Sequence, residues 1–150
     1  MDEKLRDRIV SIIDDVDDMT IATVREDGFP QATTVSYVND GLSIYFMTPV
    51  QAQKARNIAR NNKVSLTINR AYESWDDIES LSIGALAVPV TDPEEQEKIG
   101  SLLLKKFPQA AKYETDAVDL AFFRLDPVVV SLLDYSKGFG HTELVVLSES

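Results

Sequence analysis

The sequence has no cysteine, a single histidine and no long apolar segment. Without cysteine the chain forms no disulfide, no thiolate zinc site and no cysteine nucleophile. No apolar run approaches the ~20 residues of a membrane-spanning helix. The polar start MDEKLRDR is not typical of a signal peptide, so we expect a cytoplasmic protein with no membrane partner. We expect no Ser-His-Asp or Cys-His catalytic set in this sequence, whose one histidine is His141.

Basic residues are outnumbered by acidic ones, 15 to 25, which gives a net charge of −10. Such a field repels polyanions, so a nucleic-acid-binding barrel is the least favoured interpretation and we expect no nucleic-acid partner. A ligand with one phosphate remains compatible, because short-range hydrogen bonds and one or two cations overcome a screened distant field. The acidic cluster at 14–18 lacks the central Gly and the closing Glu of a calcium loop, so we expect no metal site.

The length of 150 residues and the apolar share of 44% fit one globular domain that spans residues 1–150. Residues 2–16 are predicted to form an amphipathic helix, because apolar residues recur there at helical spacing. Its apolar stripe consists of Leu5, Ile9, Ile12, Ile13 and Val16.

Three β-type runs follow, and tight-turn signals separate them. Asp27-Gly28 and Asp40-Gly41 each predict a hairpin turn, because glycine accepts a positive φ without a Cβ clash. The pattern therefore predicts a β-meander, and alternating apolar residues predict a fourth strand after the next helix. The four runs are Met19–Arg25, Gln31–Val38, Leu42–Met47 and Lys63–Asn69.

The third run leads into a predicted helix that extends to about Asn61. Thr48 is suited to the N-cap, Pro49 to the first helical position, and Gln51 completes a capping box. The first turn of such a helix presents unpaired N–H groups and a positive dipole end, which favour a phosphate. We expect a buried face, a flank with Lys54 and Asn57, and an opposite flank with Arg56 and Arg60. The expected buried face consists of Ala52, Ala55, Ile58 and Ala59.

The remaining chain predicts more strands and one further long helix. Gly84, within the apolar run Ile78–Val90, indicates a bulge or a close approach of another backbone. Six or more strands with appended helices predict a mainly β protein built as a closed antiparallel barrel. The other expected segments are a loop at Arg70–Asp77 with Trp75, a helix from Asp92 to Phe107, a short helical turn at 109–115, strands at Val118–Leu125 and Val128–Asp134 with a bulge or bend at Asp126-Pro127, a turn at Tyr135–Gly140 and a last strand at Thr142–Leu147.

Five short motifs occur in one order within residues 21–66, and together they resemble the pyridoxamine 5′-phosphate oxidase-like family, the FMN-binding split β-barrels. The motifs are Ile21-Ala22-Thr23-Val24, Asp27-Gly28-Phe29-Pro30, Tyr45-Phe46-Met47-Thr48, Lys54-Ala55-Arg56-Asn57-Ile58 and Asn61-Asn62-Lys63-Val64-Ser65-Leu66.

The resemblance implies a split, antiparallel Greek-key barrel and a homodimer whose two flavin sites lie between the subunits. It implies FMN as the cofactor and hydride transfer through the flavin N5 to or from a small substrate. The partner subunit would contribute the segment around Trp75–Ser82 and the region of Tyr135. For Trp75 itself we expect packing in the core or at an interface, with stacking near a ring system as the alternative. The expected cofactor-binding residues are Thr33, Thr34, Val35, Ser36, Met47, Thr48, Gln53, Lys54, Trp75 and Tyr135.

Some residues depart from the family pattern. The oxidase proper has arginine at the positions of Thr33 and Gln53, and an Arg-x-His where this chain has Lys137 to His141. Pyridoxamine phosphate is therefore poorly supported as a substrate, and we expect His141 to take part in acid–base catalysis beside the flavin. A flavin-binding protein without turnover, a deazaflavin-dependent enzyme and a haem-handling relative of the same fold are the alternatives.

Overall fold

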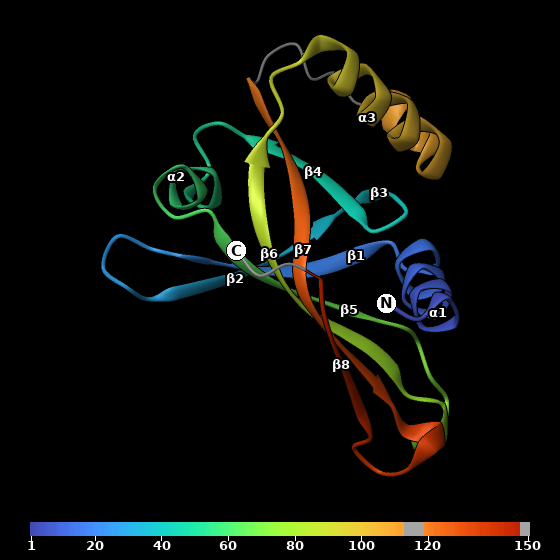
Figure 1. The fold of residues 1–150 in the computed structure, drawn as a ribbon. Helices are drawn as coiled ribbons and strands as arrows, with labels where there is room; N and C mark the ends of the chain where they lie inside the picture. The colour runs from blue at the N-terminus through green and yellow to red at the C-terminus, as the bar shows by residue number, and fades with distance from the viewer. Residues whose placement is uncertain (113–118, 148–150) are drawn as a thin grey trace.

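The computed structural model describes residues 1–112 and 119–147, in which an eight-stranded sheet is surrounded by helices (Figure 1). The α-helices are α1 (Glu3–Asp15), α2 (Gln53–Arg60) and α3 (Pro93–Lys106). Short 3-10 turns lie at Trp75–Asp77, Pro108–Lys112 and Tyr135–Lys137. The strands are β1 (Asp18–Val24), β2 (Pro30–Ser36), β3 (Val38–Asp40), β4 (Ser43–Pro49), β5 (Lys63–Asn69), β6 (Glu79–Pro89), β7 (Leu120–Asp134) and β8 (Thr142–Val146).

The sheet curls into a split barrel, and its two end strands are neighbours in the chain. The order is β2-β1-β5-β6-β7-β4-β3, with β8 added to β7, and all pairs are antiparallel. Only Tyr37 separates β2 from β3, so one bent segment joins both ends of the sheet and the predicted barrel is confirmed. The predicted unbroken strand Gln31–Val38 is wrong, because Tyr37 is buried and its hydroxyl donates to the Ile13 carbonyl at 2.6 Å.

The two predicted hairpin turns are confirmed. Gly28 lies at φ 87° between β1 and β2, and Gly41 lies at φ 60° between β3 and β4. The Asp27 carboxylate accepts from the Phe29 N–H at 3.1 Å, and the Arg25 guanidinium holds the pKa of Asp27 below its usual value.

Helix α1 packs its apolar stripe against one opening of the barrel. Ile9, Ile12 and Ile13 are fully buried and belong to the main core, as the helical spacing predicted. At the end of α3 the Lys106 ammonium donates to the carbonyls of Val16 and Tyr37, at 2.7 and 3.0 Å. Both helices therefore hold the segment at which the barrel closes.

Strand β7 corrects the prediction of two separate C-terminal strands. It runs unbroken from Leu120 to Asp134, because β6 pairs along nearly its whole length. Gly84 pairs with Val129 and Ala85 pairs with Pro127, so the extra residue of the predicted bulge is Val128. At Gly84 the bulge is therefore the expected alternative that is present, and the group close to it is a side chain and not a backbone, since an added Cβ would lie 3.0 Å from Val129 Cγ1. Val118, predicted in the first strand, lies outside the described residues.

The predicted start of α2 is wrong. Thr48 and Pro49 continue β4 and pair with Ala121 and Leu120 of β7, so the helix begins only at Gln53. Ala52 takes the N-cap position, and no side chain caps the helix there. The expected buried face also needs correction: Ala59 is exposed, whereas Asn57 is fully buried. The long pairing partner β7 decides both the end of β4 and the position of α2.

Candidate functional site

A buried amide anchors α2 to the barrel. Asn57 Nδ2 donates to Thr23 Oγ1 at 2.9 Å and to Gln31 Oε1 at 3.1 Å. Asn57 Oδ1 accepts from Gln53 Nε2 at 2.8 Å, and Gln53 Oε1 in turn accepts from Arg56 Nη2 at 2.8 Å. Our sequence interpretation placed Asn57 on an open flank. A polar residue beside the apolar stripe of a helix is the signal that could have revealed this anchor.

The first turn of α2 offers two groups suited to an anion, and strand β2 offers a third. Its leading N–H groups have no side-chain cap, so they are available to a ligand. The half-buried Lys54 makes no hydrogen bond or ion pair within the described part of the chain. Thr33 follows Gln31 on the same face of β2, and its Oγ1 is buried without a hydrogen-bond partner among the described residues. A phosphate could engage all three kinds of donor.

The other predicted residues of β2 and β4 face different sides of the sheet. Thr34 and Ser36 are exposed on the outer face, whereas Val35 packs against the main core. Thr48 is buried, and Met47 packs beside the second core under α3. The side chain of Gln53 is engaged by Asn57 and Arg56, so it has less to offer a cofactor than Lys54 has.

A cluster of aromatic side chains forms the tip of the β5–β6 and β7–β8 connections. Phe139 is 82% exposed and lies between Tyr135 and Trp75, with ring centroids 5.3 and 6.2 Å away. Trp75 is 64% exposed and therefore does not belong to the core of this chain. At His141 the carbonyl accepts from the Asp134 N–H at 2.9 Å, while Nε2 is buried without a partner among the residues described.

The aromatic tip and the start of α2 do not meet within one chain. In Figure 1 the turn Tyr135–Lys137 (orange-red) lies at the foot of the molecule, far from α2 (green). The structure therefore divides the sequence-predicted residues into two separate groups. One group belongs to β2, the end of β4 and the start of α2. The other group consists of Trp75, Tyr135 and His141.

Two cross-strand rows on the outer face of the sheet carry no charge, although 27% of the chain is charged. Each row runs without interruption across β2, β1, β5, β6, β7 and β8, and Leu144 and Val146 at the ends are 66% and 65% exposed. We call them the neutral face. Its rows are Thr34, Thr20, Thr67, Ser82, Ser131, Leu144 and Ala32, Ala22, Ser65, Gly84, Val129, Val146.

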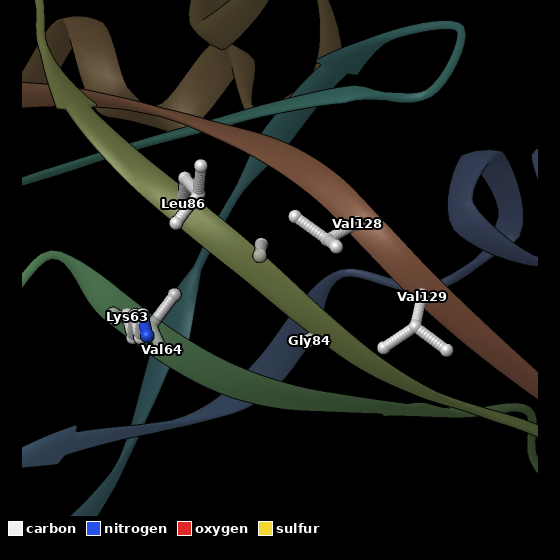
Figure 2. Close-up of a pocket in the computed structure, with 7 residues that line it drawn as sticks. Lys63, Val64, Gly84, Leu86, Val128 and Val129 are labelled. Carbon is white, nitrogen blue, oxygen red and sulfur yellow. The ribbon is translucent and has the colours of Figure 1, made fainter. Parts of the chain in front are cut away.

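A mainly apolar hollow of about 270 Å³ opens beside the neutral face at the β7 bulge, with the charged Lys63 at its edge. Figure 2 shows Leu86, Val128 and Val129 around it, with Gly84 beside them. Because Gly84 has no side chain and Val128 has no partner residue in β6, β6 and β7 leave room here. A side chain from another molecule could enter this space.

The described residues hold no helix long and apolar enough to cross a membrane. Over the same residues, no three His, Asp or Glu side chains gather in a way that could hold a metal ion.

The curled antiparallel barrel, with a helix between its fourth and fifth strands, defines a split barrel. The model of the pyridoxamine 5′-phosphate oxidase family matches residues 5–134, and the chain belongs to that family. A search of curated proteins found no match.

Several solved structures share the fold. A conserved hypothetical protein from Mycobacterium tuberculosis matches with a TM-score of 0.77 and 22% identity, over 99% of this chain and 94% of that one. The haem storage protein HutZ from Vibrio cholerae matches with a TM-score of 0.70 and 19% identity, over 93% and 92%. A haem-binding protein from Mycobacterium smegmatis matches with a TM-score of 0.76 and 21% identity, over 94% of this chain but only 56% of its own. At these identities the likeness shows the fold alone.

Proposed function

We propose that the protein binds FMN at the start of α2 and acts as an FMN-dependent oxidoreductase on a small substrate. The observation that carries this proposal is the first turn of α2, where uncapped N–H groups lie beside the unengaged Lys54. The orphaned hydroxyl of Thr33 gives independent support, because a buried polar atom usually has a partner. These residues fit a phosphate, and membership of the family makes a flavin phosphate the first candidate.

The residues of this chain would bind and orient the cofactor. Lys54 would supply a full charge, the α2 amides would donate hydrogen bonds, and Thr33 would donate one more. When bound, the flavin would supply hydride transfer at its N5, and the protein would supply position and electrostatics. The visible absorption spectrum of the purified protein tests this proposal. A flavin spectrum that bleaches with NADH or NADPH supports an enzyme, an unbleached one a flavin-binding protein, and a deazaflavin or haem spectrum contradicts FMN.

Replacing Lys54 by alanine is expected to weaken FMN binding by roughly 1.5–3 kcal/mol, the range for a charged hydrogen bond. Fluorescence titration with FMN measures the change, and riboflavin provides the control ligand because it lacks the phosphate. Riboflavin affinity should change much less. Equal losses for the two ligands would show that Lys54 acts through folding and not through the phosphate.

We also propose a homodimer that buries the neutral face. Unsatisfied charges are avoided in buried interfaces, which explains why two complete rows lack them in a chain of net charge −10. The hollow at the bulge offers a place for a side chain of the second copy. In such a dimer the aromatic tip of one subunit could also contact the flavin bound by the other.

Thr67, exposed in the middle of the neutral face, tests the dimer. Light scattering of the unchanged protein should give twice the chain mass of 16.7 kDa. Thr67→Glu should shift the protein toward the monomer, because it places a charge in the proposed interface. Thr91→Glu, an exposed threonine ahead of α3, should leave the dimer intact. A monomer at micromolar concentration for the unchanged protein would refute the interface.

A haem-handling protein is the second candidate, and His141 favours it. Its Nε2 atom is buried without a partner within the described chain, and its sequence segment contains the exposed Phe139 and the half-buried Tyr135. Imidazole is a common iron ligand, and aromatic side chains suit a flat ring system. Two of the structures with this fold are described as haem proteins.

The variant His141→Ala separates the two candidates. If His141 transfers a proton beside the flavin, turnover should fall by roughly 100-fold or more while FMN affinity stays nearly constant. A pure binding role would raise KM with little change in kcat. If the protein handles haem, the variant should instead alter the Soret absorption of added haemin. If none of these measurements changes, His141 is an ordinary surface residue with no role in function.

A further inference from the structure

Three arginines gather in one pocket on the side of α2 that carries Gln53 and Arg56. The pocket holds about 490 Å³ and lies between α2 and the β1–β2 hairpin. We call it the arginine pocket. Its lining residues are Arg25, Glu26, Asp27, Gln53, Arg56 and Arg60.

The arginines of this pocket are held differently from the structural arginines of the fold. Arg8, Arg70 and Arg124 each bond two carboxylates within 3.1 Å. By contrast, the hydrogen bond of Arg56 within the described residues goes to the neutral amide of Gln53, at 2.8 Å. Arg60 donates to the Val24 carbonyl at 3.3 Å and lies 3.9 Å from a Glu26 carboxylate that is 89% exposed.

Two like charges on neighbouring turns of α2 bring these guanidiniums together at a small cost in helix stability. Arg56 and Arg60 stand one turn apart on α2, where like charges repel by a few tenths of a kcal/mol. Helix α2 contains no acidic residue that would offset them. Arg25 joins them from the hairpin, where its bonds to Asp27, at 3.2 and 3.3 Å, fix its position. All three guanidiniums therefore have a hydrogen-bond partner, while Arg56 and Arg60 have no carboxylate within 3.5 Å among the described residues.

We propose that the arginine pocket binds the phosphate group of a small molecule, at a site separate from the one that holds Lys54. Guanidinium groups match phosphate oxygens in paired hydrogen bonds, so two converging arginines form a specific receptor for that group. The volume lies within the range of small-molecule sites, which leaves room for the rest of such a ligand. Glu26 can turn away, since its side chain is almost entirely in solvent.

The two sites lie on different sides of one helix. Gln53, Arg56 and Arg60 follow each other at spacings of three and four residues and share a side, whereas Lys54 is two residues from Arg56 and points elsewhere. Asn57 bonds to Gln53 of the arginine pocket and anchors the helix to Thr23 and Gln31. The arginine pocket therefore does not depend on flavin binding.

Titration with inorganic phosphate, followed by NMR of the arginine side-chain Nε–H signals, tests the proposal. Phosphate should shift the signals of Arg56 and Arg60 in a saturable way. The double variant Arg56→Gln/Arg60→Gln should bind phosphate at least roughly 10-fold more weakly, the equivalent of one lost charged hydrogen bond. Arg6→Gln, an exposed arginine on α1, provides the matched control and should bind normally. Circular dichroism of each variant verifies that it folds.

Two further measurements distinguish this pocket from the flavin site. Lys54→Ala should retain phosphate binding at Arg56 and Arg60, and saturating FMN should not displace the phosphate. Loss of these shifts in Lys54→Ala, or competition by FMN, would assign the pocket to the flavin phosphate and overturn a separate site. Absence of saturable shifts, or normal binding by the double variant, would overturn the proposal outright. A protein that binds no FMN can still pass or fail the phosphate titration.

Discussion

Replacing Asn57 by alanine is expected to lower the free energy of unfolding by about 2–4 kcal/mol. Asn57 is fully buried, and the change removes its hydrogen bonds to Thr23, Gln31 and Gln53. Gln31 and Gln53 are half-buried and can turn toward water. Thr23 is 1% exposed, so its hydroxyl would lose a partner that solvent cannot replace.

Chemical denaturation measures the effect, and Asn62→Ala provides the control. Asn62 is exposed at the end of α2, and we expect its replacement to change stability by no more than about 0.5 kcal/mol. Asn57 also anchors the helix that carries Lys54. The Asn57 variant should therefore bind FMN more weakly at temperatures where it remains folded. Equal stability of the two variants would show that the amide network does not anchor α2.

Replacing Ile12 by alanine is expected to cost about 2–5 kcal/mol, the range for removing a large aliphatic side chain from a core. Ile12 is fully buried between Ile9 and Ile13, where α1 closes the barrel opening. The cavity would lie between α1 and the central strands β5 and β6, so relaxation of the helix alone cannot fill it. Thermal and urea unfolding measure the loss.

Asp7→Ala provides the matched control on the exposed side of α1. Its replacement should stay within about 0.5 kcal/mol of the unchanged protein. If Ile12→Ala proved equally mild, α1 would be an appended helix rather than part of the core.

Local signals were enough to predict most of the elements. The glycines at 28 and 41 determined the hairpins, because their backbone needs a positive φ, and the spacing of the isoleucines determined α1. These features depend on neighbours in the sequence. The predicted antiparallel barrel followed from the number of strands and from the family resemblance.

The errors occurred where a distant strand decides the local structure. Thr48 and Pro49 have the composition of a helix start, yet pairing with residues 120 and 121 keeps them in β4. Asp126 and Pro127 indicate an interruption, yet β6 supports β7 through the bulge. Tyr37 looks like any strand residue until its burial under α1 shows where the barrel bends.

Prediction of the candidate site was also limited by contacts between residues that lie far apart in the sequence. Lys54 was expected beside a phosphate from its place in the helix, and the structure adds the uncapped first turn that a capping box at Thr48 had concealed. Trp75, Tyr135 and His141 were grouped only through the resemblance, and one chain does not bring them to α2. The arginine pocket could not be predicted, because Arg25 approaches Arg56 and Arg60 only after the β1–β2 hairpin packs against the helix.

The long strand β7 also has a consequence for synthesis. It pairs with β4, β6 and β8, yet residues 120–134 leave the ribosome after β4 and β6 have already emerged. Until then β4 lacks its long partner and β6 has one open edge, and exposed strand edges promote association between nascent chains. Pairings between residues so far apart in sequence also form slowly. The charged helix α3 lies between β6 and β7 in the chain. The ribosome must therefore make α3 before β7 can pair with the open edges of β4 and β6.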